Sequence, residues 1–392
     1  MRALIIGAGI AGPVAAMALQ RAGLDITIYE RRPPAPAWQG SWLTLATNGL
    51  DALSAVSASS GVARAGFVTR RIHIHSGTGR MLGTVPLGRP ADPGLDSRTM
   101  ARAELHRILL DDARRRGIPV EHGRQLVDAE VTAHGVTARF EDGQEVRGDV
   151  LVGCDGVHSV TRRLIDAAAP TPRYVGLVNF GGSTPGMSCG EPGAWHMVFG
   201  RRAFFGYAAD GWGGTAWFAN VPRPPVSPEE RRATPLDAWR ARLVELFAGD
   251  AGPMAALLSA GHLELAADNT HDLPRVPRWS RGPLVVIGDA AHAPSPSSGQ
   301  GAALAIEDAV VLAQCLRDRH SVAEALATYE RMRRRRVERV VAHGARGSSS
   351  KAPGPVGRVV RDLLLPVVFR YAVTEASLDW MYSHHLDWGQ RV

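Results

Sequence analysis

The sequence contains almost no lysine: Lys351 is the single lysine among 45 basic residues in a chain of 392. Schiff-base catalysis needs a lysine amine inside the folded body, so mechanisms of that class are excluded for the core of the chain. Cysteine is also scarce, since Cys154, Cys189 and Cys315 are the only three. They are too few and too scattered for a disulfide framework or a zinc site, which indicates a reducing compartment such as the cytoplasm.

Long apolar runs are absent as well, because no stretch approaches the length of a membrane span. Glycines interrupt the apolar residues at the N-terminus, so we expect a strand there rather than a signal peptide, and no membrane partner. The formal net charge of +7 is spread along the chain. Its one dense run, Arg333-Arg334-Arg335-Arg336, falls in a helical pattern. We interpret this run as a solvated helix face and expect no nucleic-acid partner.

The strongest positive signal is the glycine-rich run Gly7-Ala8-Gly9-Ile10-Ala11-Gly12, which lies between a predicted strand at 3–6 and a predicted helix at 13–22. Gly7 permits a tight turn, Gly9 lets the backbone approach a pyrophosphate, and Gly12 lets the helix pack closely on the strand. The N-terminus of the helix adds free N–H groups and a partial positive charge. This order of strand, turn and helix predicts a bound dinucleotide.

A second predicted strand at 25–29 ends at Glu30, 18 residues beyond Gly12. A carboxylate at this point can accept hydrogen bonds from both ribose hydroxyls of an adenosine, and it would repel a 2′-phosphate. The dinucleotide predicted here therefore carries an unphosphorylated adenosine ribose.

Two later motifs each follow an apolar strand. Asp155-Gly156-Val157-His158-Ser159-Val160-Thr161-Arg162 follows the strand at 150–153; taken alone, it could also be an Asp-Gly turn that caps a helix. Gly288-Asp289-Ala290-Ala291-His292 follows the strand at 283–287, and Gly299-Gln300-Gly301 begins a predicted helix that runs to about residue 315. The N-terminus of that helix would direct its dipole at an electron-rich ligand.

Taken together, the three motifs resemble those of the single-component FAD-dependent aromatic hydroxylases, the para-hydroxybenzoate hydroxylase superfamily, over nearly the whole chain. The resemblance implies noncovalent FAD, NADPH or NADH as a transient reductant, and O₂. Reduced flavin would form a flavin (4a)-hydroperoxide that oxygenates, most simply hydroxylates, an aromatic or polyketide-type molecule in natural-product biosynthesis or antibiotic modification. An alternative is a non-catalytic flavoprotein that sequesters an aromatic antibiotic. A flavin-dependent halogenase is excluded, because it would need a core lysine.

The resemblance also implies which residues bind the cofactor. Arg102 resembles the family arginine near the ribityl and phosphate groups, and the loop around Gln300 resembles the one beside the isoalloxazine ring. Ala303 departs from the pattern, because many relatives have asparagine there. The implied cofactor-binding residues are Gly7, Gly9, Ile10, Ala11, Gly12, Glu30, Arg31, Arg102, Asp155, Gly156, Gly288, Asp289, Pro296, Gly299, Gln300, Gly301 and Ala302.

The expected fold is α/β, with a Rossmann-like FAD-binding domain interleaved with a smaller, mainly β substrate domain. We assign 1–66, 99–172 and 278–343 to the first, 67–98 and 173–277 to the second, and 344–392 to a linker and C-terminal helical segment. Between 222 and 235 we expect a loop. The chain is expected to act as a monomer or weak homodimer.

No catalytic residue is assigned with certainty, because the flavin would supply the chemistry. The substrate domain would shape a dry pocket for a small aromatic substrate. Residues that could line this pocket are Phe180, Phe205, Trp217, Phe218 and Pro296. Residues that could act as a base, each more simply a structural histidine, are His73, His75, His196 and His292.

Overall fold

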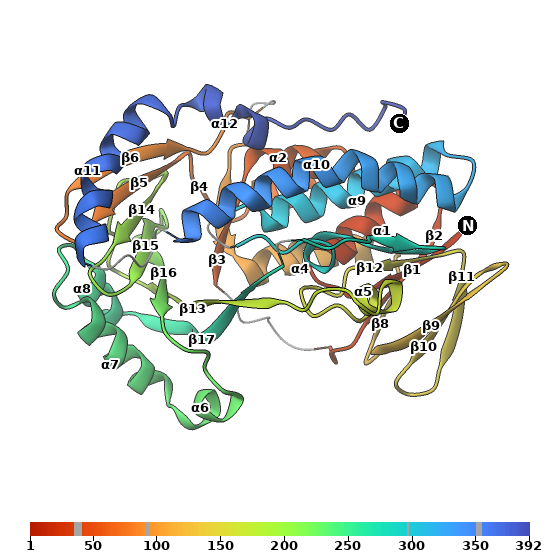
Figure 1. Cartoon of the computed structure of the whole chain (residues 1–392), viewed down its shortest axis with the longest axis horizontal. Helices are drawn as coiled ribbons and strands as arrows, with labels where there is room; N and C mark the ends of the chain where they lie inside the picture. The colour runs from red at the N-terminus through yellow and green to blue at the C-terminus, as the bar shows by residue number, and fades with distance from the viewer. Residues whose placement is uncertain (35–40, 91–93, 274, 296–297, 350–354) are drawn as a thin grey trace.

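The structure is a computed structural model that describes residues 1–34, 41–90, 94–273, 275–295, 298–349 and 355–392. Its first lobe is built on a six-stranded sheet (Figure 1). The order of strands is β18 (Ser280–Arg281), β19 (Leu284–Val286), β12 (Val150–Gly153), β1 (Arg2–Ile6), β2 (Asp25–Glu30) and β8 (Val120–His122). Apart from β18 with β19, neighbouring strands are parallel, which confirms the predicted α/β class.

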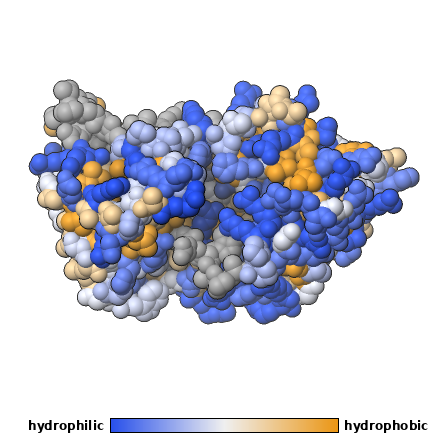
Figure 2. All heavy atoms as spheres, turned by 90° about the horizontal axis from the view of Figure 1, so that it is seen from below, coloured by the Kyte–Doolittle hydropathy of each residue, from blue (hydrophilic) through white to orange (hydrophobic). Residues whose placement is uncertain are grey.

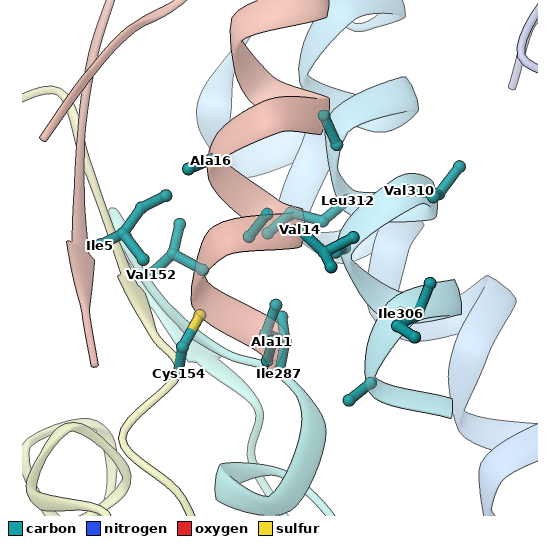
Figure 3. Packing of buried hydrophobic residues seen from close by; sticks show 14 of the residues in the cluster. Ile5, Ala11, Val14, Ala16, Val152, Cys154, Ile287, Ile306, Val310 and Leu312 are labelled. Carbon is teal, nitrogen blue, oxygen red and sulfur yellow. The ribbon is translucent and has the colours of Figure 1, made fainter. Parts of the chain in front are cut away.

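Both faces of this sheet are covered, which is why its central strands are continuous apolar runs. Helix α1 (Ala11–Arg21) packs on one face of the sheet, and helix α9 (Gly301–Asp318) packs on the side of α1 that is turned away from the sheet. Figure 3 shows Ile5 and Val152 of the sheet on one side of α1 and Leu312 of α9 on the other. The opposite face meets an antiparallel sheet, where the Phe140 ring lies 4.8 Å from the Tyr29 ring. That sheet contains β9 (Leu126–Thr132), β10 (Gly135–Phe140) and β11 (Glu145–Gly148).

The second lobe is built on a seven-stranded sheet that takes its strands from two separate parts of the chain. Their order is β17 (His262–Asp272), β13 (Arg173–Thr184), β16 (Thr215–Pro222), β15 (Phe204–Ala209), β14 (Ala194–Phe199), β5 (Arg71–Ser76) and β6 (Met81–Pro86). Residues 71–86 and 173–272 thus share one sheet, the interleaved arrangement expected from the sequence. The domain boundaries themselves remain a prediction.

Three helices in the second lobe were not predicted. Helices α7 (Leu236–Phe247) and α8 (Met254–Ala260) pack on one face of the sheet, and α6 (Pro228–Ala233) lies where a loop was expected. Each is short, and the prolines and glycines around them obscure a helical apolar period. The helix-free interpretation of 222–235 is therefore wrong.

A three-stranded sheet connects the lobes. It contains β3 (Trp42–Leu45), β7 (Arg98–Ala101) and β4 (Phe67–Val68). Trp195 of β14 donates its indole N–H to the hydroxyls of Thr44 and Thr99, each at 3.0 Å. Helices α2 (Thr47–Ser54), α3 (Ser59–Ala63) and α4 (Arg102–Arg115) follow these strands and return the chain to the first lobe.

The C-terminal part differs from the expected linker. Helix α10 (Val322–Ser349) continues past residue 343 and packs along α9. Helix α11 (Pro355–Tyr371) contacts β6, and α12 (Glu375–Tyr382) precedes a tail that returns to the first lobe. There the guanidinium groups of Arg21 and Arg317 each lie over the Trp388 ring, at 4.8 and 4.9 Å from its centroid. Within the described ranges, no helix has the length and apolar character to cross a membrane.

Candidate functional site

The first glycine motif has the geometry that a pyrophosphate site needs. Gly7 has a φ of +101°, and a Cβ on it would lie 2.6 Å from the carbonyl oxygen of Cys154. A Cβ on Gly12 would lie 1.9 Å from the carbonyl oxygen of Gly7, so α1 packs on the turn only without a side chain there. A Cβ on Gly9 would meet open space. No side chain caps α1, which leaves its N-terminal N–H groups available to an anion.

Glu30 ends β2 beside this turn. Its side chain is buried, and the carboxylate accepts hydrogen bonds from the backbone N–H of Ala8 (2.8 Å) and of Arg32 (3.0 Å). These bonds fix the carboxylate next to the glycine turn, while each oxygen keeps a further lone pair for a ribose hydroxyl. Its neighbour Arg31 is exposed.

The side chain of Asp155 organises the start of α5 (Val160–Ile165). It accepts hydrogen bonds from the Ser159 hydroxyl (2.5 Å) and from the backbone N–H of Thr161 (2.9 Å). The helix-capping alternative therefore describes this carboxylate correctly. Arg162 is buried and donates to the carbonyl oxygens of Val157 and Ala290, at 2.8 and 3.1 Å, so the second motif is tied to the third.

The third motif places Asp289 and the N-terminus of α9 side by side. Asp289 lies in a 3₁₀ turn (Gly288–Ala290), with Oδ1 3.8 Å from the position of a Cβ on Gly301. Helix α9 begins after Gln300 without a side-chain cap, and Gly299 has a φ of +61°. Gln300 is fully buried, whereas Gly301 and Ala302 are partly exposed. Pro296 lies outside the described residues.

A buried ion network lies directly behind this loop and was missed from the sequence. Arg333 binds Glu307 and Asp308, each at 2.7 Å, and Arg336 binds Glu307 at 2.8 Å. His292 binds Asp308 at 2.5 Å, so the structure gives it a structural partner. Arg333 is 2% exposed and Arg336 11%, so interpreting the whole arginine run as a solvated face was wrong. The adjacent acidic pair within the otherwise apolar stretch 302–313 of α9 was the available signal.

Charge pairing keeps this network ionised. Burial alone would raise the pKa of Glu307, but Arg333 and Arg336 outweigh it and hold that pKa at about 2. Burial would likewise raise the pKa of Asp308, but His292 and Arg333 hold it well below its ordinary value.

The aromatic residues predicted to line a pocket divide between the two faces of the second sheet. Phe180, Phe205 and Trp217 are fully buried against α7 and α8. The Phe205 ring stacks on Trp217 at 5.9 Å and meets the Phe247 ring edge-on at 5.1 Å. Assigning these three residues to a pocket was therefore wrong, because alternation along the strands turns them toward the helices.

Phe218 lies on the other face, which is turned toward β3 and the first lobe. It packs with Trp195 and with Met197. Next to it, Asn220 donates a hydrogen bond to Asn179 on the same face. Ile72, Asn179, Met197 and Phe218 are partly exposed, and Figure 2 shows the surface hollowed between the two lobes.

Three of the histidines considered as bases lie on the helix-covered side of the sheet. His196 pairs in register with Tyr207, and Tyr207 pairs with Trp217. The side chain of His196 therefore lies on the same face of the sheet as Trp217, the face covered by α7 and α8. Its ring stacks on Tyr207 at 4.9 Å, and burial together with His75 and His73 lowers its pKa to about 4. His73, His75 and His196 therefore do not face the first lobe. Among the described residues, no group of histidine, cysteine and carboxylate side chains could hold a metal ion.

Arg102 and Ala303, the remaining two positions compared with the family pattern, lie on α4 and α9. Arg102 is the first residue of α4 and is exposed, with its backbone N–H donating to the carbonyl oxygen of Ser41 at 3.0 Å. Ala303 is buried, and its Cβ lies 3.1 Å from the position of a Cβ on Gly49. The absence of asparagine at 303 therefore coincides with a close approach of α2 to α9.

Known proteins support this picture. The family model described as FAD binding domain matches residues 1–343. The chain is 33% identical over 349 residues to the FAD-dependent urate hydroxylase of Klebsiella pneumoniae, with 87% of this chain and 88% of that protein covered. It is 32% identical over 345 residues to the aurachin C monooxygenase/isomerase of Stigmatella aurantiaca, with 86% of each covered. The crystal structure of Klebsiella pneumoniae HpxO with FAD and uric acid superposes with a TM-score of 0.83 at 28% identity, covering 97% of this chain and 96% of that one.

The chain therefore belongs to the FAD-binding family of the para-hydroxybenzoate hydroxylase superfamily. It is a single-component FAD-dependent monooxygenase of the aromatic hydroxylase type, a class that uses NAD(P)H and O₂. The predicted fold, cofactor and enzyme class are confirmed. The geometry also fits FAD, because the space above Gly9 and the uncapped helix N-termini suit its anionic and electron-rich parts.

Proposed function

We propose that FAD extends from the glycine turn to the α9 loop. Its pyrophosphate would bind at the N-terminus of α1, its adenosine ribose at Glu30, and its ribityl chain at Asp289. Its ring would lie between the α9 loop and the second sheet. This proposal rests on one observation. The glycine turn, the Asp289 turn and the start of α9 lie on the same side of the sheet, because parallel strands end at one edge.

The substrate pocket would use the face of the second sheet that is turned toward the first lobe. Its partly exposed side chains are Ile72, Met197 and Phe218, with Asn179 as a polar neighbour. Apolar side chains with one amide suit a flat, uncharged aromatic or heteroaromatic molecule better than a small anion. We propose oxygenation of an aromatic or polyketide-type compound, a range that includes the kinds of molecule named for the relatives.

When bound, reduced FAD would activate O₂ and supply the oxygen atom that enters the product. The residues of the chain would orient the substrate and keep water out. The apolar rings around Phe218 would exclude water, and the amide of Asn179, which accepts a hydrogen bond from Asn220, would fix the orientation of the substrate. The start of α9 would direct positive dipole charge at the electron-rich edge of the reduced ring.

The test is a screen of uncharged aromatic, heteroaromatic and polyketide compounds for stimulated oxidation of NADPH and of NADH. Mass spectrometry should find a product heavier by one oxygen atom, labelled when ¹⁸O₂ is supplied. A protein that binds FAD and the compound but gives neither stimulation nor product would instead support the sequestering alternative. Anionic substrates that outperform every neutral compound would contradict the proposed pocket.

A further inference from the structure

An exposed apolar face lies on α11, which runs along the outer edge of the second lobe beside β6 (Figure 1). Among the described residues, four of the twelve exposed large apolar side chains fall within 363–368. They are Leu363, Leu364, Val367 and Val368, and each is 45–62% exposed. Residues spaced in this way lie on one side of a helix. A gathering of exposed apolar side chains on one surface indicates a binding partner.

The opposite side of α11 is docked on the second sheet. Leu365 and Phe369 are partly buried there. A Cβ on Gly83 of β6 would collide with the Phe369 side chain, so the helix comes this close only because the strand has no side chain at that point. The buried cluster against which the helix packs consists of Ile74, Leu82, Phe199 and Phe204. The exposed face is therefore not the side by which α11 is held to its own lobe.

The docked side adjoins the face of the sheet proposed to bind the substrate. Ile72, Met197 and Phe218 pack against the same buried cluster as Leu365 and Phe369. One helix thus presents apolar side chains to the outside and to the cluster that supports the pocket face. This continuity suits an enzyme whose substrate comes from an apolar phase rather than from water.

The charge of the chain indicates what kind of surface would cover the exposed face. The sequence of α11 contains Arg358, Arg361 and Arg370 against a single acid, Asp362, and the whole chain carries a net charge of +7. A basic amphipathic helix is suited to a surface of anionic lipids. The lack of a spanning segment predicts no membrane partner, but a helix that lies along the surface needs no such segment.

A second copy of the chain fits this face less well. It would bring the same positive charge to the contact. A stable interface between proteins also uses about 20–30 residues on each side, whereas this face offers four exposed apolar side chains. An anionic lipid surface needs no matching patch of its own, because its headgroups and chains supply both charge and apolar contact.

We propose that the outer face of α11 binds an anionic lipid surface, and that the substrate is a lipophilic aromatic molecule taken from that surface. The choice of substrate rests on the proposed function. The binding to lipid does not, because it follows from α11 alone.

The test measures flotation of the full-length, FAD-loaded protein with vesicles. Vesicles of phosphatidylcholine mixed with phosphatidylglycerol should bind the protein at least about tenfold more tightly than vesicles of phosphatidylcholine alone, and added salt should weaken the binding. Leu363→Gln/Val367→Gln should weaken binding to the mixed vesicles by at least about tenfold, because two apolar side chains no longer enter the lipid.

The matched control is Leu236→Gln/Val131→Gln, which changes two exposed apolar residues on α7 and β9. It should bind the vesicles as the parent protein does. All substituted positions are exposed, so FAD content and melting temperature should agree among the three proteins. Leu364→Gln/Val368→Gln repeats the test on the same face of α11.

A second measurement addresses the substrate. Lipophilic aromatic compounds that stimulate NADPH or NADH oxidation are supplied in the mixed vesicles and, separately, dissolved in buffer. Leu363→Gln/Val367→Gln should raise the apparent KM about tenfold for the compound in vesicles, with kcat unchanged. For the dissolved compound, neither constant should change.

The outcomes separate the two proposals. The lipid inference is overturned if the mixed vesicles do not bind the parent protein, or if the control variant loses as much binding as the α11 variants. A parent dimer that the α11 variants convert to a monomer, without binding to vesicles, would overturn it in favour of a second copy. If no compound of any kind is oxygenated, the proposed function fails, while the vesicle result still decides the role of α11.

Discussion

Replacing Arg333 by leucine gives the sharpest test of the buried network behind the α9 loop. Arg333 contacts Glu307 and Asp308 at 2.7 Å, and both carboxylates are completely buried. Removing one partner of a buried ion pair costs about 3–5 kcal/mol, a large share of the 5–15 kcal/mol that is typical of a folded protein. Arg335→Leu is the matched control, because Arg335 is exposed on the same helix and its loss should cost less than about 0.5 kcal/mol.

The stability of the parent chain and the stability of Arg333→Leu should depend on pH with opposite sign. In the parent chain the pKa of Glu307 is about 2, below the unfolded value of about 4.3. Its stabilisation is therefore present above about pH 4.3 and is lost as the pH falls through about 2. In Arg333→Leu, Glu307 keeps Arg336 and Asp308 keeps His292, but each buried carboxylate loses one cation. Burial then raises the pKa of both carboxylates relative to the parent chain, so the folded variant takes up protons at a higher pH. The stability deficit of the variant should shrink as the pH falls from about 7 toward 5.

Urea denaturation of the FAD-loaded and FAD-free proteins at several pH values between 7.5 and 5.5 measures both effects. Arg333→Leu/Asp308→Asn should recover part of the loss, because one of the two buried carboxylates that lost Arg333 is then neutral. The reasoning is refuted if Arg333→Leu is no less stable than Arg335→Leu, or if its deficit stays constant across this pH range.

Three further predictions concern the flavin and the second sheet. Glu30→Ala should weaken FAD binding by about 1–3 kcal/mol in a titration of the FAD-free protein, and unchanged affinity would mean that the ribose contact lies elsewhere. Trp217→Ala should lower stability by about 3–5 kcal/mol, with NAD(P)H oxidation still coupled to product formation. Phe218→Ala should keep FAD but release hydrogen peroxide. The reverse pattern would put the pocket on the other face. Gly12→Ala, whose Cβ would lie 1.9 Å from a backbone oxygen, should disturb the fold and FAD content together, while Gly9→Ala, facing open space, should keep the fold and lose FAD affinity. Melting curves of the FAD-free proteins distinguish these two glycine variants.

The cofactor class could be predicted from the sequence because it depends on local backbone geometry. A tight turn between a strand and a helix requires glycine at Gly7 and Gly12, and the residue types alone reveal it. The acid at the end of the second strand and the glycine pair before α9 are likewise fixed at short range. The parallel sheet follows from the same strand and helix periods.

Which of these side chains are covered was decided only by the tertiary structure. Phe218 and Trp217 are neighbours in one strand, so alternation alone puts them on opposite faces. Only the docking of α7 and α8 decides that the face of Trp217 is the covered one. The arginine run on α10 is an equally clear case. Its spacing allows a solvated face, but the acidic pair on α9, 25 residues or more away in sequence, draws Arg333 inside and leaves Arg335 in water. The acidic pair in an apolar stretch indicates that a basic partner is needed, but which arginine supplies it depends on the packing of α10 on α9 and became known only once the chain was folded.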